Sequence, residues 1–326
     1  MASIHCEPAC RQRHRKRPGD AELDTRGTGS CQHKGRVATM PETEVAVEGV
    51  ARLMGALFLA GCVIAGYMLL RAMAHPPPWR RRIGLLCSRP WQPVDIGLVL
   101  CVVAAGQLLA ALAHMPDVTE GSWQYYAQFV LRTSIVFHGA AGAAVWILCV
   151  NRNINPLRAF GIRRGKAARE VAAGVVAYLA AFPAVTVAAL LAGLLLSAMN
   201  EEQSFQPVVS MMAEPDQSIV VRVYLCLLAV VVAPVVEEVV FRGMALPVLT
   251  RYLGFPAAVS VVSMVFALMH GHLWSLAPLF AVAVAFSLGY TLTGSLRVPI
   301  VMHAVFNAVN LFHVLMFPDT VNGLSQ

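Results

Sequence analysis

Long apolar stretches separated by short polar loops dominate the chain from about residue 47 onward. Most of them are near the ~20 residues that a helix needs to cross a bilayer. Only helices and closed barrels can span lipid, and these stretches lack the alternation of barrel strands. The pattern therefore predicts an all-α, polytopic membrane helix bundle with about eight transmembrane helices. The expected segments are 47–74, 94–115, 129–150, 170–198, 219–250, 256–272, 276–294 and 299–317.

The N-terminal stretch 1–39 departs from this pattern, since it is polar and contains the basic run RQRHRKR from Arg11 to Arg17. No apolar segment follows this run before Met40, as it would in a secretory signal peptide. We expect residues 1–39 to be a disordered basic tail outside the fold. Met40 stands just before the first hydrophobic segment, which suggests that the tail results from a mis-assigned start of translation.

The composition supports a membrane protein, because 57% of the residues are hydrophobic and only 13% are charged. Soluble domains have about 25% charged residues. The net charge of +7 raises the question of nucleic-acid binding, but the basic residues lie mostly in short loops, where they set topology. We therefore expect the lipid bilayer, and no nucleic acid, as a partner. The eight cysteines show no standard zinc spacing and no disulfide framework.

Positive charge is concentrated in alternate loops, which predicts the orientation of the chain. The loops 75–93 and 151–169 are rich in arginine, and Arg251 and Arg297 stand at the next two turns on that side. The positive-inside rule places this side in the cytoplasm. We therefore expect a multi-pass protein of the cell membrane with both termini outside. The basic tail conflicts with an outside N-terminus, whereas the acidic stretch PETEVAVE after Met40 agrees with it.

Ionisable residues interrupt the apolar segments of the C-terminal half, notably in PVVEEVVFRG, from Pro234 to Gly243. Each costs about 2.5–3.5 kcal/mol at a helix centre and by default marks a functional site. Glu238 and Arg242 are four residues apart, so they share a helix face and can pair. Glu237 lies about 100° further round the helix and is left unpaired. An unpaired buried carboxylate tends to take up a proton, so Glu237 is the residue that needs a functional explanation.

His270 is the expected neighbour of Glu237. Gly254 and Pro256 break the helix, and Glu237 and His270 lie at nearly equal separations in sequence on either side of Gly254. In an antiparallel hairpin the two side chains would lie at nearly the same height, where they could bind and activate one water. A core histidine is the alternative interpretation. The remaining histidines are set aside because they lie near segment ends, are isolated or point elsewhere: His75, His114, His138, His272 and His313.

His303, Asn307 and Asn310 form one stripe on the last helix, at positions i, i+4 and i+7. Interhelical hydrogen bonding is a sufficient explanation for Asn310. For His303 and Asn307 we expect hydrogen-bond donors that point into a cavity shared with Glu237 and His270.

Three motifs thus occur in order: Glu237-Glu238-x-x-x-Arg242, Phe266-x-x-x-His270 and His303-x-x-x-Asn307. Together they resemble the CAAX-protease and bacteriocin-processing (CPBP, or Abi) family of intramembrane proteases, which includes the eukaryotic CAAX prenyl protease 2. The resemblance covers roughly residues 219–317. It implies that 219–317 form the catalytic transmembrane core. Residues 40–218 carry no signal of the family, and their apolar segments predict N-terminal transmembrane helices.

The resemblance also implies an activity, namely hydrolysis of peptide bonds in membrane-embedded, membrane-anchored or lipidated substrates, at a site open to the cytoplasm. In the family's proposed mechanism Glu237 would be the general base, assisted by His270. His303 and Asn307 would stabilise the oxyanion, while Glu238 and Arg242 would order the site.

The family leaves the cofactor open, because members have been described both as metalloproteases and as metal-independent glutamate proteases. Two histidines and a glutamate could hold a divalent metal such as zinc. Asn307 is a poor zinc ligand and the chain has no HExxH motif, so we expect that no metal is required.

Two other functions compete with the protease. One is a non-catalytic membrane scaffold or immunity protein with a protease-like fold. The other is a transporter whose buried charges relay protons, although its polar residues would be expected in two repeated halves, and here they lie in one.

Overall fold

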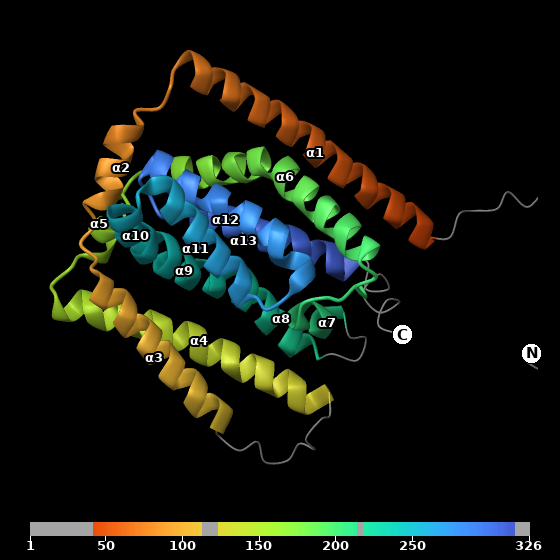
Figure 1. Ribbon diagram of the computed structural model, residues 1–326. Coiled ribbons are helices and arrows are strands. Elements are labelled where there is room, and N and C mark those ends of the chain that lie inside the picture. The colour runs from red at the N-terminus through yellow and green to blue at the C-terminus, as the bar shows by residue number, and fades with distance from the viewer. Residues whose placement is uncertain (1–41, 113–122, 214–217, 317–326) are drawn as a thin grey trace, which may run out of the picture. The chain divides into compact units, whose positions relative to one another are not determined.

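The computed structural model of the protein describes residues 42–112, 123–213 and 218–316. In these ranges the regular structure is helical and contains no strand, which confirms the all-α prediction. The helices from Glu42 onward make one compact unit (Figure 1). The predicted tail, residues 1–39, lies outside the described residues and stays a prediction.

The helices follow one another along the chain without other regular elements between them. The N-terminal helices are α1 (Glu42–Ala74), α2 (Trp79–Cys87), α3 (Pro93–Leu112), α4 (Trp123–Asn151), α5 (Pro156–Ala159), α6 (Ala167–Ala198) and α7 (Pro207–Ala213). A continuous helical run follows as α8 (Ile219–Leu227), η1 (Leu228–Val232), α9 (Ala233–Glu238), η2 (Val239–Ala245) and α10 (Leu246–Leu253). The last helices are α11 (Phe255–Met269), α12 (Leu273–Thr293) and α13 (Arg297–Met316).

Seven helical runs among the described residues are long and apolar enough to cross a membrane. The eighth predicted segment, 256–272, forms α11, which has 15 residues. At ~1.5 Å per residue α11 is about 22 Å long, less than the ~30 Å hydrocarbon core. The expectation of about eight crossings therefore becomes seven full-length helices and one shorter apolar helix.

Apolar side chains cover much of the outside of the bundle, whereas two charged side chains of the central helical run lie within it. On α1, Leu59, Val63 and Leu70 are 67%, 72% and 68% exposed. Glu238 and Arg242, in contrast, are fully buried. Exposed apolar surface on this scale is incompatible with water and suits lipid contact. The fold is that of a multi-pass membrane protein.

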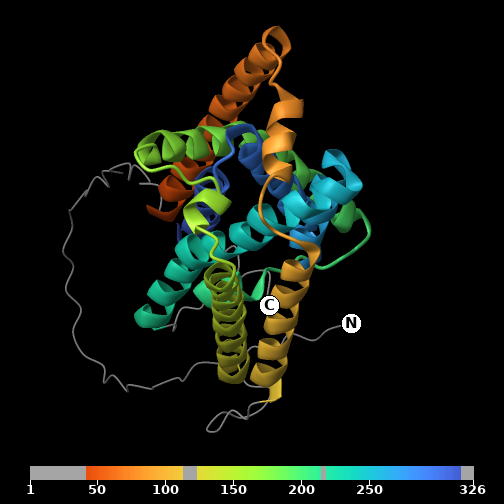
Figure 2. The same ribbon diagram turned by 90° about the vertical axis from the view of Figure 1, so that its left-hand side faces the viewer.

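The helices of the two halves pack against each other. α6 and α11 lie against α12, and α13 packs against α6 and α12. α1 runs along α6 (Figure 1). α3 and α4 form a pair that lies beside α9 and η2 (Figure 2). The N-terminal helices therefore build one wall of the region that carries the motif glutamates.

The arginine-rich loops meet at one end of the bundle, as their alternation predicts. Arg89 donates hydrogen bonds to the carbonyls of Arg158, at 2.9 Å, and Gly294, at 2.8 Å. Arg251 donates to the carbonyl of Trp91. The short helices α2 and α5 lie at this end, on the left of Figure 1.

Two ion pairs fasten helix ends near these loops. Arg152, the residue directly after α4, contacts Asp95 in the first turn of α3. Arg297, the first residue of α13, contacts Glu170 in the first turn of α6. Both carboxylate residues are buried, so the pairs fix the register of the helices that they join.

Candidate active site

The helix that carries the motif glutamates is interrupted by two π-helical segments, η1 before α9 and η2 after it. Such segments are frequent at functional sites. In η1 the N–H of Ala233 donates to the carbonyl of Leu228, five residues back. Pro234 has no N–H to continue this pattern at the carbonyl of Ala229. The side-chain Nδ2 of Asn307 donates there instead, at 2.7 Å.

Glu238 and Arg242 form the predicted buried pair. Arg242 Nη1 donates to Glu238 Oε1 at 2.8 Å, and Arg242 Nη2 donates to the carbonyl of Ala283 at 3.1 Å. The guanidinium carbon lies 4.7 Å from the ring centre of Phe266 and 5.2 Å from that of Phe286. Arg242 thereby joins η2 to α11 and α12, and the pairing predicted from the i, i+4 spacing is confirmed.

His303 connects the two glutamates from α13. Its Nδ1 donates to Glu238 Oε1 at 3.0 Å, and its Nε2 lies 3.9 Å from Glu237 Oε2. The imidazole stacks on the ring of Phe286, with centroids 5.1 Å apart. His303 is therefore held in one orientation by packing and by a carboxylate.

Glu237 is paired, contrary to expectation, and its partner is His138 of α4. Glu237 Oε1 lies 3.2 Å from His138 Nε2, and the two side chains are 14% and 10% exposed. His138 Nδ1 lies 2.7 Å from the carbonyl of Ser134, which can only accept, so Nδ1 carries a hydrogen. One proton is therefore shared between Nε2 and Oε1, as an imidazolium and carboxylate or as their neutral forms.

Setting His138 aside as isolated was wrong. It lies within the apolar segment 129–150. The rule that an ionisable residue in a transmembrane segment marks a functional site therefore applied to His138 as much as to Glu237. Because His138 contacts Glu237 from the N-terminal half, the polar residues do not all lie in one half of the chain, and that argument against a transporter no longer holds.

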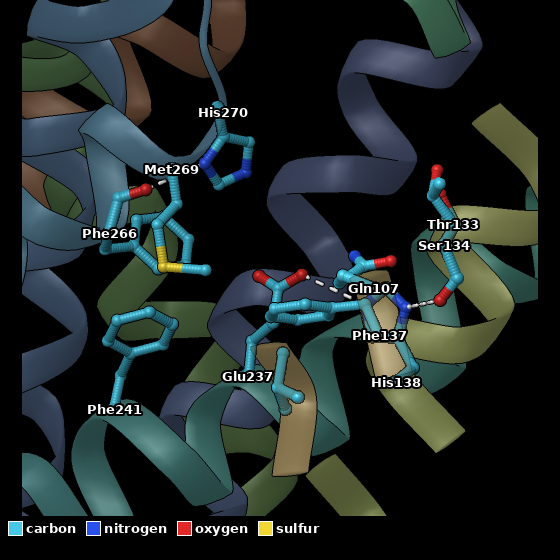
Figure 3. Close-up of a pocket in the computed structure, with 11 residues that line it drawn as sticks. Gln107, Thr133, Ser134, Phe137, His138, Glu237, Phe241, Phe266, Met269 and His270 are labelled. Atoms are coloured by element: carbon cyan, nitrogen blue, oxygen red, sulfur yellow. Dashed lines mark hydrogen bonds and ion pairs between the residues drawn. The ribbon is translucent and has the colours of Figure 1, made fainter. Parts of the chain in front are cut away.

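Glu237 and His270 line the same cavity of about 430 Å³. His270 follows the last residue of α11, and its Nδ1 donates to the carbonyl of Phe266 at 2.8 Å. No hydrogen bond or ion pair joins Glu237 and His270 in the part of the chain that the structure describes. The hairpin through Gly254 brings them to a common space, as expected, but not into direct contact (Figure 3).

The cavity lies between α3 and α4 on one side and α9, η2 and α11 on the other. Its size falls within the ~300–1,000 Å³ of ligand pockets in proteins. Figure 3 shows the carboxylate of Glu237 between His138 and His270. The lining residues are Val103, Gln107, Thr133, Ser134, Phe137, His138, Glu237, Phe241, Phe266, Met269 and His270.

The six residues predicted from the motifs thus fall into three groups. Glu237 and His270 face the cavity. Glu238, Arg242 and His303 form a buried network next to Glu237. Asn307 donates a hydrogen bond to the Ala229 carbonyl of η1. His303 and Asn307 do not belong to the cavity lining. His303 is bonded instead to the Glu238 carboxylate, and Asn307 to the Ala229 carbonyl.

The histidines and glutamates of the site are possible metal ligands by residue type. Within residues 42–112, 123–213 and 218–316, no three His, Cys, Asp or Glu side chains are grouped so that they could hold a metal ion. Nδ1 of His138, His270 and His303 is already engaged by a carbonyl or a carboxylate.

Comparison with known proteins identifies the segment that contains these motifs. Residues 219–309 match the family model described as type II CAAX prenyl endopeptidase Rce1-like. The chain is 30% identical over 102 residues to the membrane-embedded CAAX protease MroQ of Staphylococcus aureus (strain USA300). This alignment covers 29% of the chain and 41% of that relative, and no solved structure matches the chain. The family resemblance of the motifs is thereby confirmed: residues 219–309 are similar to Rce1-like CAAX endopeptidases, and the chain spans less than half the length of the relative that it matches.

Proposed function

We propose that the protein is an intramembrane endopeptidase in which Glu237 is the general base for attack by water on a peptide bond. The observation that carries this proposal is the placement of the Glu237 carboxylate on the wall of a cavity between apolar helices. Its Oε1 is engaged by His138, whereas its Oε2 has no hydrogen-bond partner among the described residues. Oε2 is buried and carries no hydrogen bond within the described ranges, and it is the proposed proton acceptor.

In this mechanism Glu237 removes a proton from water as the water oxygen attacks the carbonyl carbon. The proton then passes to the leaving nitrogen when the carbon–nitrogen bond breaks. General base catalysis of this kind contributes about 10²–10⁴-fold. His270 helps to orient the water through Nε2, the ring nitrogen that the Phe266 carbonyl does not engage.

In the proposal His303 and Asn307 stabilise the oxyanion, at about 3–4 kcal/mol per donor in other hydrolases. Neither residue lines the cavity, so the proposal requires the substrate to extend beyond it to reach them. Because Nδ1 of His303 donates to Glu238, Nε2 can donate only when the ring carries both hydrogens. Asn307 uses one of its two N–H groups at the Ala229 carbonyl, which leaves one for a substrate. Glu238 and Arg242 hold His303 and the helix in place.

The proposed substrates are membrane-embedded or membrane-anchored peptides and proteins, including lipidated C-termini. The apolar part of the cavity wall suits such a chain, since it includes Val103, Phe137, Phe241, Phe266 and Met269. Access from the cytoplasm is supported by the position of His303. It lies six residues, about 9 Å, from the start of α13 at the arginine-rich end.

The direct test is Glu237→Gln in proteoliposomes with a panel of fluorogenic peptides anchored by a C-terminal prenyl chain. We expect the rate to fall at least ~10²-fold, because the amide cannot take up the proton. The matched control is Glu48→Gln, which changes an exposed glutamate paired with Arg52 on α1 and should cleave normally. Unchanged cleavage by Glu237→Gln would remove Glu237 as the base, and inactivity of the unaltered protein would favour the scaffold function.

We also propose that the reaction requires no metal. The support is that, among the described residues, no three His, Cys, Asp or Glu side chains are grouped so that they could hold a metal ion. Protein purified and assayed with a strong chelator should retain its full rate. Activity that is lost with the chelator and returns with zinc alone would contradict this proposal.

A further inference from the structure

We propose that His138 is a positioning residue for Glu237, contributed to the active site by a helix outside the family-matched segment. The inference rests on the proposed function, because a positioning role requires Glu237 to act as the base. His138 lies in α4, 99 residues before Glu237, and the matched segment begins only at residue 219. On this inference, residues 219–309 do not hold the complete site.

Contacts within α4 orient the His138 imidazole, and the imidazole in turn orients the Glu237 carboxylate. Nδ1 donates to the Ser134 carbonyl on the same helix, and the Phe137 ring lies edge-on, with centroids 5.1 Å apart. These contacts direct Nε2 toward Glu237 Oε1, at 3.2 Å. A carboxylate with one oxygen held in this way cannot rotate freely, so the other oxygen is presented in one direction. Preorganisation of this kind places a base before substrate arrives.

Other charged or titratable groups face Glu237 from the neighbouring helices, but none of them holds Oε1. His303 of α13 approaches Oε2, at 3.9 Å, and is itself bonded to Glu238. Arg242 is engaged by Glu238 and by the Ala283 carbonyl. His270, after α11, bonds to its own helix. Among the described residues, the hydrogen bond at Oε1 comes from His138, so its removal should release the carboxylate.

A set of variants at one position separates positioning from packing. In His138→Gln the amide nitrogen can occupy the place of Nε2 and still donate to Glu237. In His138→Asn the amide reaches only the place of Nδ1, and in His138→Phe the ring volume is kept without any donor. We expect His138→Gln to keep kcat within about fivefold, whereas the other two lose roughly 10–100-fold in kcat, the usual effect of a lost hydrogen bond to a charged group. KM should stay within about twofold in all three.

The matched control is His75→Gln, since His75 is an exposed histidine after the end of α1 and outside the cavity. Its kcat should be unchanged. Two disruptive variants are included so that the test stands if either of them fails to fold, which thermal unfolding of each purified protein will show.

Two outcomes would overturn the positioning role while leaving the proposed function intact. Either folded His138→Asn and His138→Phe cleave like the unaltered protein, or His138→Gln is as slow as His138→Phe. Glu237→Gln, measured beside them, must be inactive in both cases. Full activity of Glu237→Gln would instead defeat the proposed function itself.

Discussion

The charge network next to Glu237 makes a residue-scale prediction about stability. Arg242→Met should lower the free energy of unfolding by about 3–5 kcal/mol, because Glu238 would stay buried with an uncompensated charge. Thermal or denaturant unfolding in detergent measures the loss. Arg52→Met is the matched control, since Arg52 and Glu48 are also four residues apart but are largely exposed, and it should change stability little. Equal losses in the two variants would contradict the assigned role of the buried pair.

Whether a contact could be predicted depended on its separation in sequence. The spacing of four residues was enough to pair Glu238 with Arg242. No local rule connects Glu237 to His138, because the two residues are 99 positions apart on helices that meet only in the folded bundle. The partner of Asn307 could not be predicted either, since it is a backbone carbonyl. This carbonyl lacks a backbone donor only because the local helix is π-helical and places Pro234 opposite it.

At the scale of the helix, Pro234 and Asn307 should be energetically coupled. Asn307→Ala leaves the Ala229 carbonyl without the amide donor and should cost about 1–3 kcal/mol of stability. In a Pro234→Ala background the new backbone N–H can serve this carbonyl, so the same substitution should cost less. Unfolding of the two single variants and the double variant gives the coupling free energy. A cost that is the same in both backgrounds would show that the amide does not replace the proline's missing donor.

The positions of the helices followed from hydropathy, but their internal geometry did not. Apolar length predicted the segments, and the Gly254 break predicted the turn, where φ is +79°. Hydropathy measures the apolar character of a stretch and carries no information on its hydrogen-bond ladder, so η1 and η2 were not predicted. For the same reason the apolar stretch 256–272 suggested a full crossing, although α11 is a 15-residue helix bounded by the Gly254 turn and His270.

At the scale of the whole molecule, the fold gathers the arginine-rich loops at one end, and the positive-inside rule predicts that this end is cytoplasmic. Arg164 precedes α6 and Asn200 follows it, so the two exposed residues flank one membrane-spanning helix. We introduce Arg164→Cys or Asn200→Cys into a variant without the eight native cysteines. In intact cells a membrane-impermeant maleimide should label only the Asn200→Cys protein, and permeabilised cells should show labelling of both.

If the labelling pattern of residues 164 and 200 were reversed, both the arginine-rich loops and the proposed active site would face the outside of the cell. His303 lies about 9 Å along α13 from the arginine-rich end, and it contacts Glu238 beside the proposed base. A residue 164 that is labelled only after permeabilisation would therefore place the proposed base, Glu237, on the side of substrates anchored in the inner leaflet. If residue 164 were labelled from outside, the enzyme would act on extracellular or periplasmic substrates, because the helix that carries His303 begins on the same side as that loop.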